Sequence, residues 1–339
     1  MMPPRLTTSW KMAGTMFFRL ASSALFSHPP YQEGYGGNMQ NPSESLMRCV
    51  IPDEGMIFLS ADQEGAEAKI VAYEAPKGDF RGLFDAGIKP HQYVAVDIFL
   101  DDYQREFFPN KPKAYFEALR PPLVAGLDEW RPMVKTLKDI YEVRYFLGKK
   151  TCHSGNYDVG PATFVASVLE ETEGAINLPI EKGKEFGNRY RMRFPEIPEW
   201  QSECRATVKR TGRLYNLLGH PITFTRRIHE ANERELYAAV PQSTVGEITN
   251  LAWIELQEFI QNDNLPWDLL NNKHDSILLQ VPNNKEHVEM GYHALKRHLG
   301  RELRSTKGED FVMGTEVSYG FNWGKHSADN PNGMKVFKL

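Results

Sequence analysis

Along the chain, apolar positions form short strand-like runs and longer helix-like segments. Residues 54–62 (EGMIFLSAD) predict a short buried strand. Residues 64–75 predict a helix that ends before Pro76. Another helix is expected over residues 89–100, which carry apolar side chains along one side. Residues 1–50 are instead rich in Gly, Pro, Ser and Asn, and their hydrophobic periodicity is weak.

The rest of the chain predicts helices and strands in separate clusters. Helices are expected over residues 133–151, 178–194, 198–210, 243–263 and 284–303. Strands are expected in a hairpin over residues 212–227 that turns at Gly219-His220, on either side of His274-Asp275, and over residues 313–323. Because these elements do not follow a βαβ alternation, the predicted fold class is α+β.

Composition narrows the class of protein only moderately. The 339 residues are 41% hydrophobic and 25% charged, which is typical of a globular chain with one large domain or two ordinary ones. The net charge of −4 does not favour indiscriminate nucleic-acid binding, although it permits a local basic channel. Three widely spaced cysteines argue against disulfides or a zinc site and favour a reducing cytoplasm. No apolar run approaches the ~20 residues of a membrane span, so no membrane association is expected.

Two aspartates carry the strongest chemical signal. Asp62 and Asp275 each lie beside a short apolar strand, and neither has an arginine or lysine directly next to it. Paired carboxylates at strand ends suit a two-metal phosphoryl-transfer site, because they are hard ligands for two Mg²⁺ ions ~4 Å apart. Taken singly, each aspartate has a simpler structural explanation, a helix N-cap at Asp62 and a turn residue at Asp275, and the spacing alone does not overturn it.

The segments around these aspartates resemble conserved motifs of family A DNA polymerases. FLSADQEGAEAKIVAYEA is similar to the first catalytic motif, with Asp62, Glu67 and Lys69 in its characteristic places. KHDSILLQVP resembles the third motif, a His-Asp pair at a hairpin turn. Further similar segments follow in the family's order, namely NMQN, KPHQYVAVDIF, RYFLGKKTCHSGNYDVG, GRLYNLLGHPITFTRR, ERELYAAVPQSTVGEITNLAWIEL and EVSYGFNWGK. The resemblance covers about residues 6–325.

The resemblance implies a right-hand architecture with an antiparallel palm sheet and a helical fingers subdomain. The palm would comprise residues 1–88 and 226–339, the fingers residues 89–225, and no thumb or exonuclease domain is evident. The implied reaction is template-directed transfer of dNTPs onto the 3′-hydroxyl of a primer, with release of pyrophosphate. The implied partners are primer-template DNA and dNTPs, and the implied cofactors are two Mg²⁺ ions, with Mn²⁺ as a substitute. The implied location is the cytoplasm of a bacterial or phage-infected cell.

The resemblance also implies roles for individual residues. Metal ligands would be Asp62, Asp275 and the backbone carbonyl of Gln63, with Lys149 as phosphate ligand and proton donor. The other implied nucleotide contacts are Glu67 as sugar gate, His91, Arg144, His153 and Tyr157. The primer end would be contacted by Arg19, Gln242 and His274. Independently of the family, Lys149, His153 and Tyr157 are spaced i, i+4, i+8, which places them in one stripe ~80° wide on a helix.

This chain departs from the family pattern at several places. His153 stands where Phe or Tyr is usual, and the ending Tyr-Gly becomes Tyr157-Asp158. Ser276 replaces an acid that usually follows the His-Asp pair, so we expect one negative charge fewer near the metals. Arg144 precedes Lys149 by five residues instead of one helical turn. Residues 101–130 exceed the family pattern and have no assigned role.

Two alternative functions remain open at this stage. One is a single-subunit RNA polymerase-like enzyme, which Ser276 favours and Glu67 opposes. The other is a non-catalytic nucleic-acid-binding protein, or one subunit of a split polymerase whose partner chain supplies thumb and exonuclease. The second alternative follows from the poor grip on duplex DNA expected without a thumb, since backbone contacts supply most of the affinity.

Overall fold

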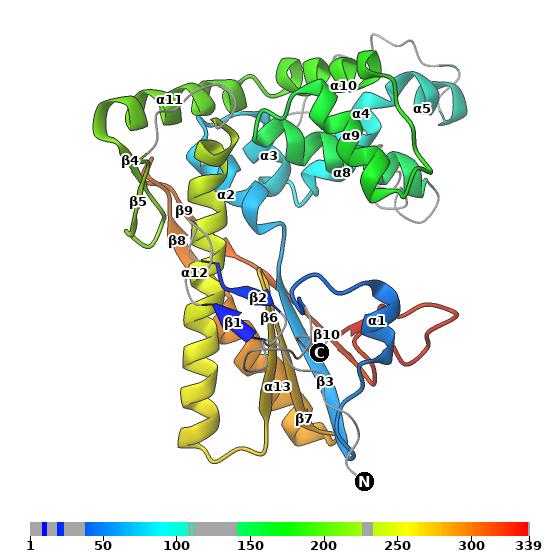
Figure 1. Ribbon diagram of the computed structural model, residues 1–339, viewed down its shortest axis with the longest axis vertical. Helices are drawn as coiled ribbons and strands as arrows, with labels where there is room; N and C mark the ends of the chain where they lie inside the picture. Colours follow the sequence, from blue (N-terminus) through cyan, green and yellow to red (C-terminus); the bar gives the residue numbers. More distant parts are fainter. Residues whose placement is uncertain are drawn as a thin grey trace, which may run out of the picture.

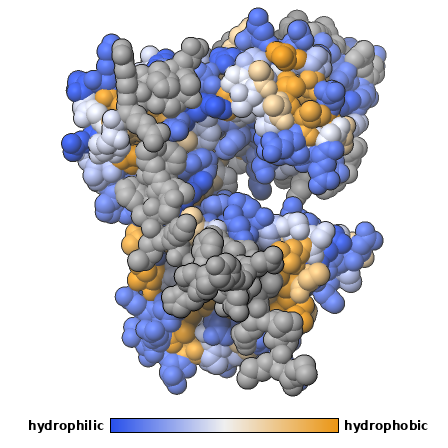
Figure 2. All heavy atoms as spheres, in the orientation of Figure 1, coloured by the Kyte–Doolittle hydropathy of each residue, from blue (hydrophilic) through white to orange (hydrophobic). Residues whose placement is uncertain are grey.

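The polypeptide forms two lobes (Figure 1). The computed structural model describes residues 9–11, 19–23, 38–107, 110, 141–225 and 233–337. A helical lobe lies above a sheet lobe in the view of Figure 1, and helix α12 (Glu233–Asn262) runs beside both. The surface is hollowed between the two lobes (Figure 2). Within the described ranges, no helix combines the length and apolar character that a membrane span requires.

The sheet lobe is built on a five-stranded sheet in which all neighbouring strands are antiparallel. Its strand order is β11 (Lys335–Val336), β10 (Thr315–Gly320), β3 (Met56–Gln63), β7 (Ser276–Pro282) and β6 (Asp268–Lys273). The apolar run predicted as a strand thus becomes the central strand β3, because burial on both faces suits a continuous apolar sequence. This arrangement brings the first and third motifs side by side in the sheet.

Both faces of this sheet are covered. Helix α13 (Lys285–Leu299) packs on one face, where Gly291 allows a close approach: a Cβ there would lie 2.5 Å from a Leu59 methyl carbon. Phe58, Leu278 and Trp323 form a second cluster on the opposite face, with neighbours that include Met47 of helix α1 (Glu44–Cys49). A sheet buried on both faces is a rigid support for side chains at its strand ends.

The helical lobe consists of helices packed around an aromatic core. Its helices are α3 (Asp79–Asp85), α4 (Pro90–Ile98), α5 (Leu100–Phe107), α8 (Glu142–Asn156), α9 (Pro161–Glu171), α10 (Ile180–Arg193) and α11 (Glu196–Thr211). Helix α2 (Ala66–Glu74) follows β3 directly and joins the lobes. Helices α4 and α8 approach closely, because a Cβ on Gly148 would lie 2.3 Å from the Cβ of Ala95. The position of α8 is therefore set largely by α4.

Three two-stranded antiparallel sheets complete the described fold. They are β1–β2 (Ser9–Lys11 and Ala21–Ser23), β4–β5 (Arg213–Tyr215 and Pro221–Thr223) and β8–β9 (Arg301–Arg304 and Asp310–Met313). The β4–β5 turn is fastened to α12, since Asn216 donates to Glu247 at 2.5 Å. The β8–β9 turn is fastened to α2, where Glu74 accepts from the backbone and hydroxyl of Thr306, each at 2.7 Å.

The α+β prediction is confirmed, and several predicted boundaries shift. Helix α12 begins ten residues before the predicted start at Ser243 and continues through Pro241. The last predicted helix ends at Leu299 and is followed by β8, which the sequence did not indicate. Helix α9 was also missed, because Gly160-Pro161 was interpreted as an interruption, whereas Pro161 is its first residue. The predicted helix over residues 133–151 is described only from Glu142 onward, and residues 226–227 of the predicted hairpin lie outside the described residues.

Candidate active site

Asp62 lies in a row of polar side chains that crosses the sheet. It pairs with Glu316 of β10 on one side and with Ser276 of β7 on the other, and Ser276 pairs in turn with Lys273 of β6. Directly opposite residues of antiparallel strands project from the same face. Asp62 therefore has an acid on one side and a hydroxyl on the other, with an ammonium one strand further away.

Asp275 lies in the two-residue turn that joins β6 to β7. The preceding residue, His274, has φ +56°, a left-handed conformation that few non-glycine residues adopt. The backbone N–H of Gln63, the residue after Asp62, donates to the carbonyl oxygen of Asp275 at 3.0 Å. This hydrogen bond fixes the turn against the end of β3, so the two predicted metal ligands lie in adjacent backbone segments.

Burial and neighbouring negative charge raise the pKa of both carboxyl groups. Burial, with the negative charges of Asp275 and Glu316 added, raises the pKa of Asp62 from 3.8 to about 8, even though its side chain is accessible to solvent. Burial also raises the pKa of Asp275. The ammonium groups of Lys273 and Lys149 act in the opposite direction on Asp62. Neither carboxylate forms an ion pair with another described residue.

This donor set fits a divalent cation. Two neighbouring hard oxygen donors that repel each other and lack a cationic partner are stabilised when a metal ion neutralises them. The described residues contain no group of three or more His, Cys, Asp or Glu side chains arranged to hold a metal ion. A metal at this position would therefore draw on the two aspartates, backbone oxygen, and ligands from outside the protein.

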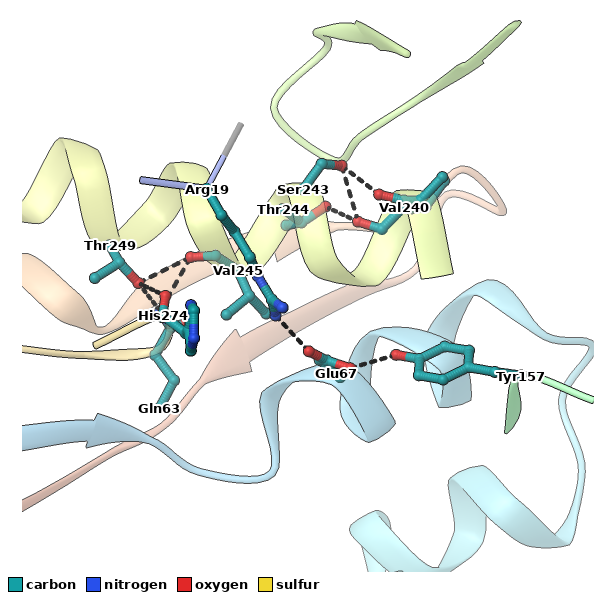
Figure 3. Close-up of polar contacts among 11 residues, drawn as sticks. Arg19, Gln63, Glu67, Tyr157, Val240, Ser243, Thr244, Val245, Thr249 and His274 are labelled. Carbon is teal, nitrogen blue, oxygen red and sulfur yellow. Dashed lines mark hydrogen bonds and ion pairs between the residues drawn. The ribbon is translucent and has the colours of Figure 1, made fainter. Parts of the chain in front are cut away.

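Glu67 lies between Arg19 and Tyr157 and contacts both side chains (Figure 3). Its carboxylate forms an ion pair with Arg19 and accepts a hydrogen bond from the Tyr157 hydroxyl at 2.5 Å. Burial alone would raise its pKa, but the charge of Arg19, the proximity of His153 and the bond from Tyr157 hold it below the ordinary value. Glu67 is thus an anion at neutral pH, with defined partners on both sides.

The predicted stripe on α8 faces this region. Tyr157 is the C-terminal cap residue of α8 and is buried, and the ring of His153 meets it edge-on at 4.9 Å between ring centres. Burial lowers the pKa of His153. Lys149 is exposed and forms no ion pair with another described residue, and its charge lowers the pKa of Asp62. An ammonium group, a neutral imidazole and a phenol therefore lie on the helix next to the carboxylates.

His91 and Arg144 lie near the start of α8 but have different partners. His91 Nε2 shares a hydrogen bond of 2.9 Å with the hydroxyl of Tyr145, which is one helical turn before Lys149. Arg144 forms an ion pair of 2.8 Å with Glu106 of α5. Five residues correspond to about 140° around an α-helix, so Arg144 and Lys149 project in different directions. The structure thus joins His91 to α8 through Tyr145, one turn from Lys149, and pairs Arg144 with Glu106 of α5.

The primer-contact candidates come from three further segments. Arg19 and His274 project toward the same region (Figure 3), and burial together with the charges of Arg19 and Lys273 lowers the pKa of His274. Gln242 is half-buried inside α12, two turns before Thr249 on the same side of the helix. The candidate residues thus converge from the N-terminal segment, β3, α2, α8, α12 and the β6–β7 turn.

Comparisons with known proteins agree with this geometry. Residues 169–325 match the sequence model of DNA polymerase family A. A DNA polymerase I from Caldicellulosiruptor bescii is 20% identical over 329 residues, which cover 94% of this chain and 32% of that protein. The solved POL domain of Pol1 from M. smegmatis, in complex with DNA primer-template and dNTP, is 16% identical with a TM-score of 0.64. That match covers 94% of this chain and 48% of the solved one.

The fold and the comparisons show a chain that is similar to the polymerase domain of family A DNA polymerases. The resemblance to family A DNA polymerases is confirmed, and so is the right-hand architecture with an antiparallel sheet and a helical subdomain. The chain spans about a third of the length of the curated relative and about half of the solved structure.

Sequence reasoning missed four residues of this region: Glu316, Tyr145, Glu106 and Thr249. Glu316 alternates with buried Thr315 and Val317, so the strand pattern contained the signal that it faces away from the core. Tyr145 could have been found from its spacing of four residues before Lys149. Glu106 and Thr249 carried no sequence signal, because their contacts join segments far apart in the chain.

Proposed function

We propose that this chain is the catalytic domain of a template-directed DNA polymerase that transfers dNTPs onto a primer 3′-hydroxyl. The observation that carries the proposal is the pair Asp62 and Asp275, held together at the strand ends without an ion-paired partner among the described residues. Two carboxyl groups with raised pKa values close together are typical of a functional site. The exposed ammonium group of Lys149 beside them suits binding of a phosphate group. The family comparisons support this chemistry.

Asp62, Asp275 and the backbone carbonyl of Gln63 would hold two Mg²⁺ ions, with Mn²⁺ as a substitute. When bound, such ions activate the primer hydroxyl and neutralise charge on the reacting phosphate. The raised pKa of Asp62 means that the metal-free site holds protons at neutral pH, so metal affinity should increase with pH.

The side chains on and near α8 bind the nucleotide in this proposal. Lys149 neutralises the triphosphate and donates a proton to the leaving pyrophosphate, and His91 contributes a second phosphate contact. Tyr157 and His153 lie against base and sugar. Glu67, fixed between Arg19 and Tyr157, fills the space beside C2′ and rejects a ribose hydroxyl. Arg144 acts on the triphosphate only if its ion pair with Glu106 opens.

Arg19, Gln242 and His274 contact the primer end. Their donors suit the minor-groove acceptors and phosphates that all sequences share, so binding would not depend on sequence. The sheet lobe is proposed as the palm (residues 1–88 and 226–339) and the helical lobe as the fingers (residues 89–225). A partner chain that supplies thumb and exonuclease remains a prediction.

Primer extension with Mg²⁺ and dNTPs tests the proposal. Asp62→Ala and Asp275→Ala should each abolish extension, whereas Asp263→Ala, an exposed aspartate at the end of α12, should retain it. Robust extension by both active-site variants would contradict the two-metal assignment.

Replacing dNTPs by NTPs tests the RNA polymerase alternative, which Ser276 favours. Tight DNA binding by the wild type with no extension under either metal would support a non-catalytic role.

A further inference from the structure

Thr249 joins three structural elements at a single buried oxygen atom (Figure 3). It lies in the middle of α12 and is 1% exposed. Its Oγ1 accepts a hydrogen bond from Gln63 Nε2 at 2.8 Å and is 3.0 Å from the carbonyl oxygen of His274. It is also 2.9 Å from the carbonyl oxygen of Val245, one turn earlier in the same helix.

The hydroxyl has one hydrogen to donate and two carbonyls within reach. Bonding back to the preceding turn is the usual choice of a helical threonine. Here the Val245 carbonyl also accepts a hydrogen bond from Gln63 Nε2 at 3.3 Å. Because Gln63 Nε2 already donates to the Val245 carbonyl, the Thr249 hydroxyl can donate its hydrogen to the His274 carbonyl instead. The hydroxyl then links the end of β3 to the β6–β7 turn.

The linked residues are the immediate neighbours of the two carboxylates. Gln63 follows Asp62, and His274 precedes Asp275. The backbone bond from Gln63 N–H to the Asp275 carbonyl, 3.0 Å long, runs between the same two segments. The Thr249 link also ends on a residue in a sparsely populated backbone conformation, since His274 has a left-handed φ of +56° that its surroundings must support. The family resemblance implied no role for Thr249.

We propose that Thr249 is a positioning residue that sets the separation of Asp62 and Asp275 and thereby tunes affinity for divalent metal. The proposal rests on the proposed function of these aspartates as metal ligands. Thr249 contacts neither carboxylate, so it acts through Gln63 and His274. Its removal leaves Gln63 Nε2 and the His274 carbonyl with one partner fewer in a buried environment, which favours rearrangement of both segments.

The test measures Mn²⁺ binding to the protein without DNA or nucleotide, by titration calorimetry or electron paramagnetic resonance. Thr249→Val, which keeps the shape of the side chain, should weaken binding about tenfold or more. Thr249→Ser, which retains the hydroxyl, should stay within about twofold of the wild type. Gln63→Met removes the partner on the strand side and should weaken binding in the same way, so the proposal remains testable if Thr249→Val does not fold.

Thr244→Val is the matched control. Thr244 is a fully buried threonine of the same helix whose hydroxyl accepts from the Leu217 backbone in the β4–β5 turn, so it has no link to the carboxylates. Its loss should lower the melting temperature but leave Mn²⁺ affinity unchanged. Equal affinities of wild type and Thr249→Val, or equal weakening by Thr244→Val, would overturn the proposal.

Primer extension separates this proposal from the proposed function. A wild type that binds Mn²⁺ but extends no primer contradicts the polymerase assignment and leaves the Mn²⁺ comparison valid. If the wild type extends primers, Thr249→Val should need about tenfold more Mg²⁺ for half-maximal rate. An unchanged Mg²⁺ requirement in a folded Thr249→Val variant would contradict the positioning role alone.

Discussion

Replacing Asp62 by asparagine should stabilise the metal-free protein at alkaline pH, although it removes a proposed catalytic group. The folded protein raises the pKa of Asp62 from 3.8 to about 8, through burial and the charges of Asp275 and Glu316. A carboxyl group whose pKa rises on folding favours the folded state at low pH, where it is protonated in both states. That contribution is lost as the pH rises from about 4 through 8, because the folded state must then bear an unfavourable charge.

The magnitude follows from the size of the pKa change. A rise from 3.8 to about 8 corresponds to roughly 6 kcal/mol if the group were sealed from water. The Asp62 side chain is accessible to solvent, and water screens its repulsion from Asp275, so about 1–2 kcal/mol is the realistic gain. For a chain of this size, that gain is about 1–3 °C in melting temperature. Below about pH 4, wild type and Asp62→Asn should melt together.

Thermal unfolding in EDTA, recorded by circular dichroism between pH 5 and 9, tests this reasoning. Asp263→Asn is the control, because it makes the same chemical change at an exposed aspartate and should shift the melting temperature little at any pH. Addition of Mg²⁺ should stabilise wild type and not Asp62→Asn, since only the wild type retains both carboxylates. A variant that is no more stable than wild type at pH 8.5, or equally stabilised at pH 5 and 8.5, would refute the proposed repulsion.

Three further predictions concern the surroundings of the site. Gly148→Ala should destabilise the fold by about 2–3 kcal/mol, seen as a lower melting temperature, because the added Cβ would lie 2.3 Å from that of Ala95. Glu67→Ala should lower discrimination between dNTPs and NTPs about tenfold in kcat/KM, and unchanged discrimination would remove it from the sugar contact. Asp158→Gly should change stability by less than about 1 kcal/mol in urea unfolding, because relief of its φ of +51° offsets the lost ion pair with Arg191. Arg191→Ala, which loses only the pair, should not be more stable than wild type.

The elements that the sequence predicted best are those whose local pattern agrees with their tertiary surroundings. Strand β3 is apolar and buried on both faces, and α2 ends where Pro76 requires. Helix α12 was predicted too short because Pro241 is a local helix breaker, yet its neighbours Tyr237 and Val240 are buried and hold that part of the helix in place. Packing energy that depends on distant segments overrides the local preference there, and a single sequence does not contain that information.

The residues of the candidate site also fall into those that a local pattern predicts and those that only the fold brings together. Residues with a fixed spacing, such as Lys149, His153 and Tyr157, could be grouped from helical geometry alone. Residues that meet across the fold required a family resemblance: no local pattern indicates that Arg19 pairs with Glu67. Arg144 illustrates the limit of resemblance, since its ion pair with Glu106 comes from a segment that exceeds the family pattern.

Ser276 shows how a departure from a motif can be offset elsewhere in the fold. From the third motif alone, Ser276 predicts one negative charge fewer beside the proposed metal ligands. In the sheet, Asp62 has Ser276 on one side and Glu316 directly opposite on the other, and the charge of Glu316 contributes to the raised pKa of Asp62. The local charge therefore depends on which strand flanks β3 on each side. Because β10 comes near the end of the chain and pairs with β3 from near its beginning, the effect of Ser276 follows from the strand order rather than from the motif.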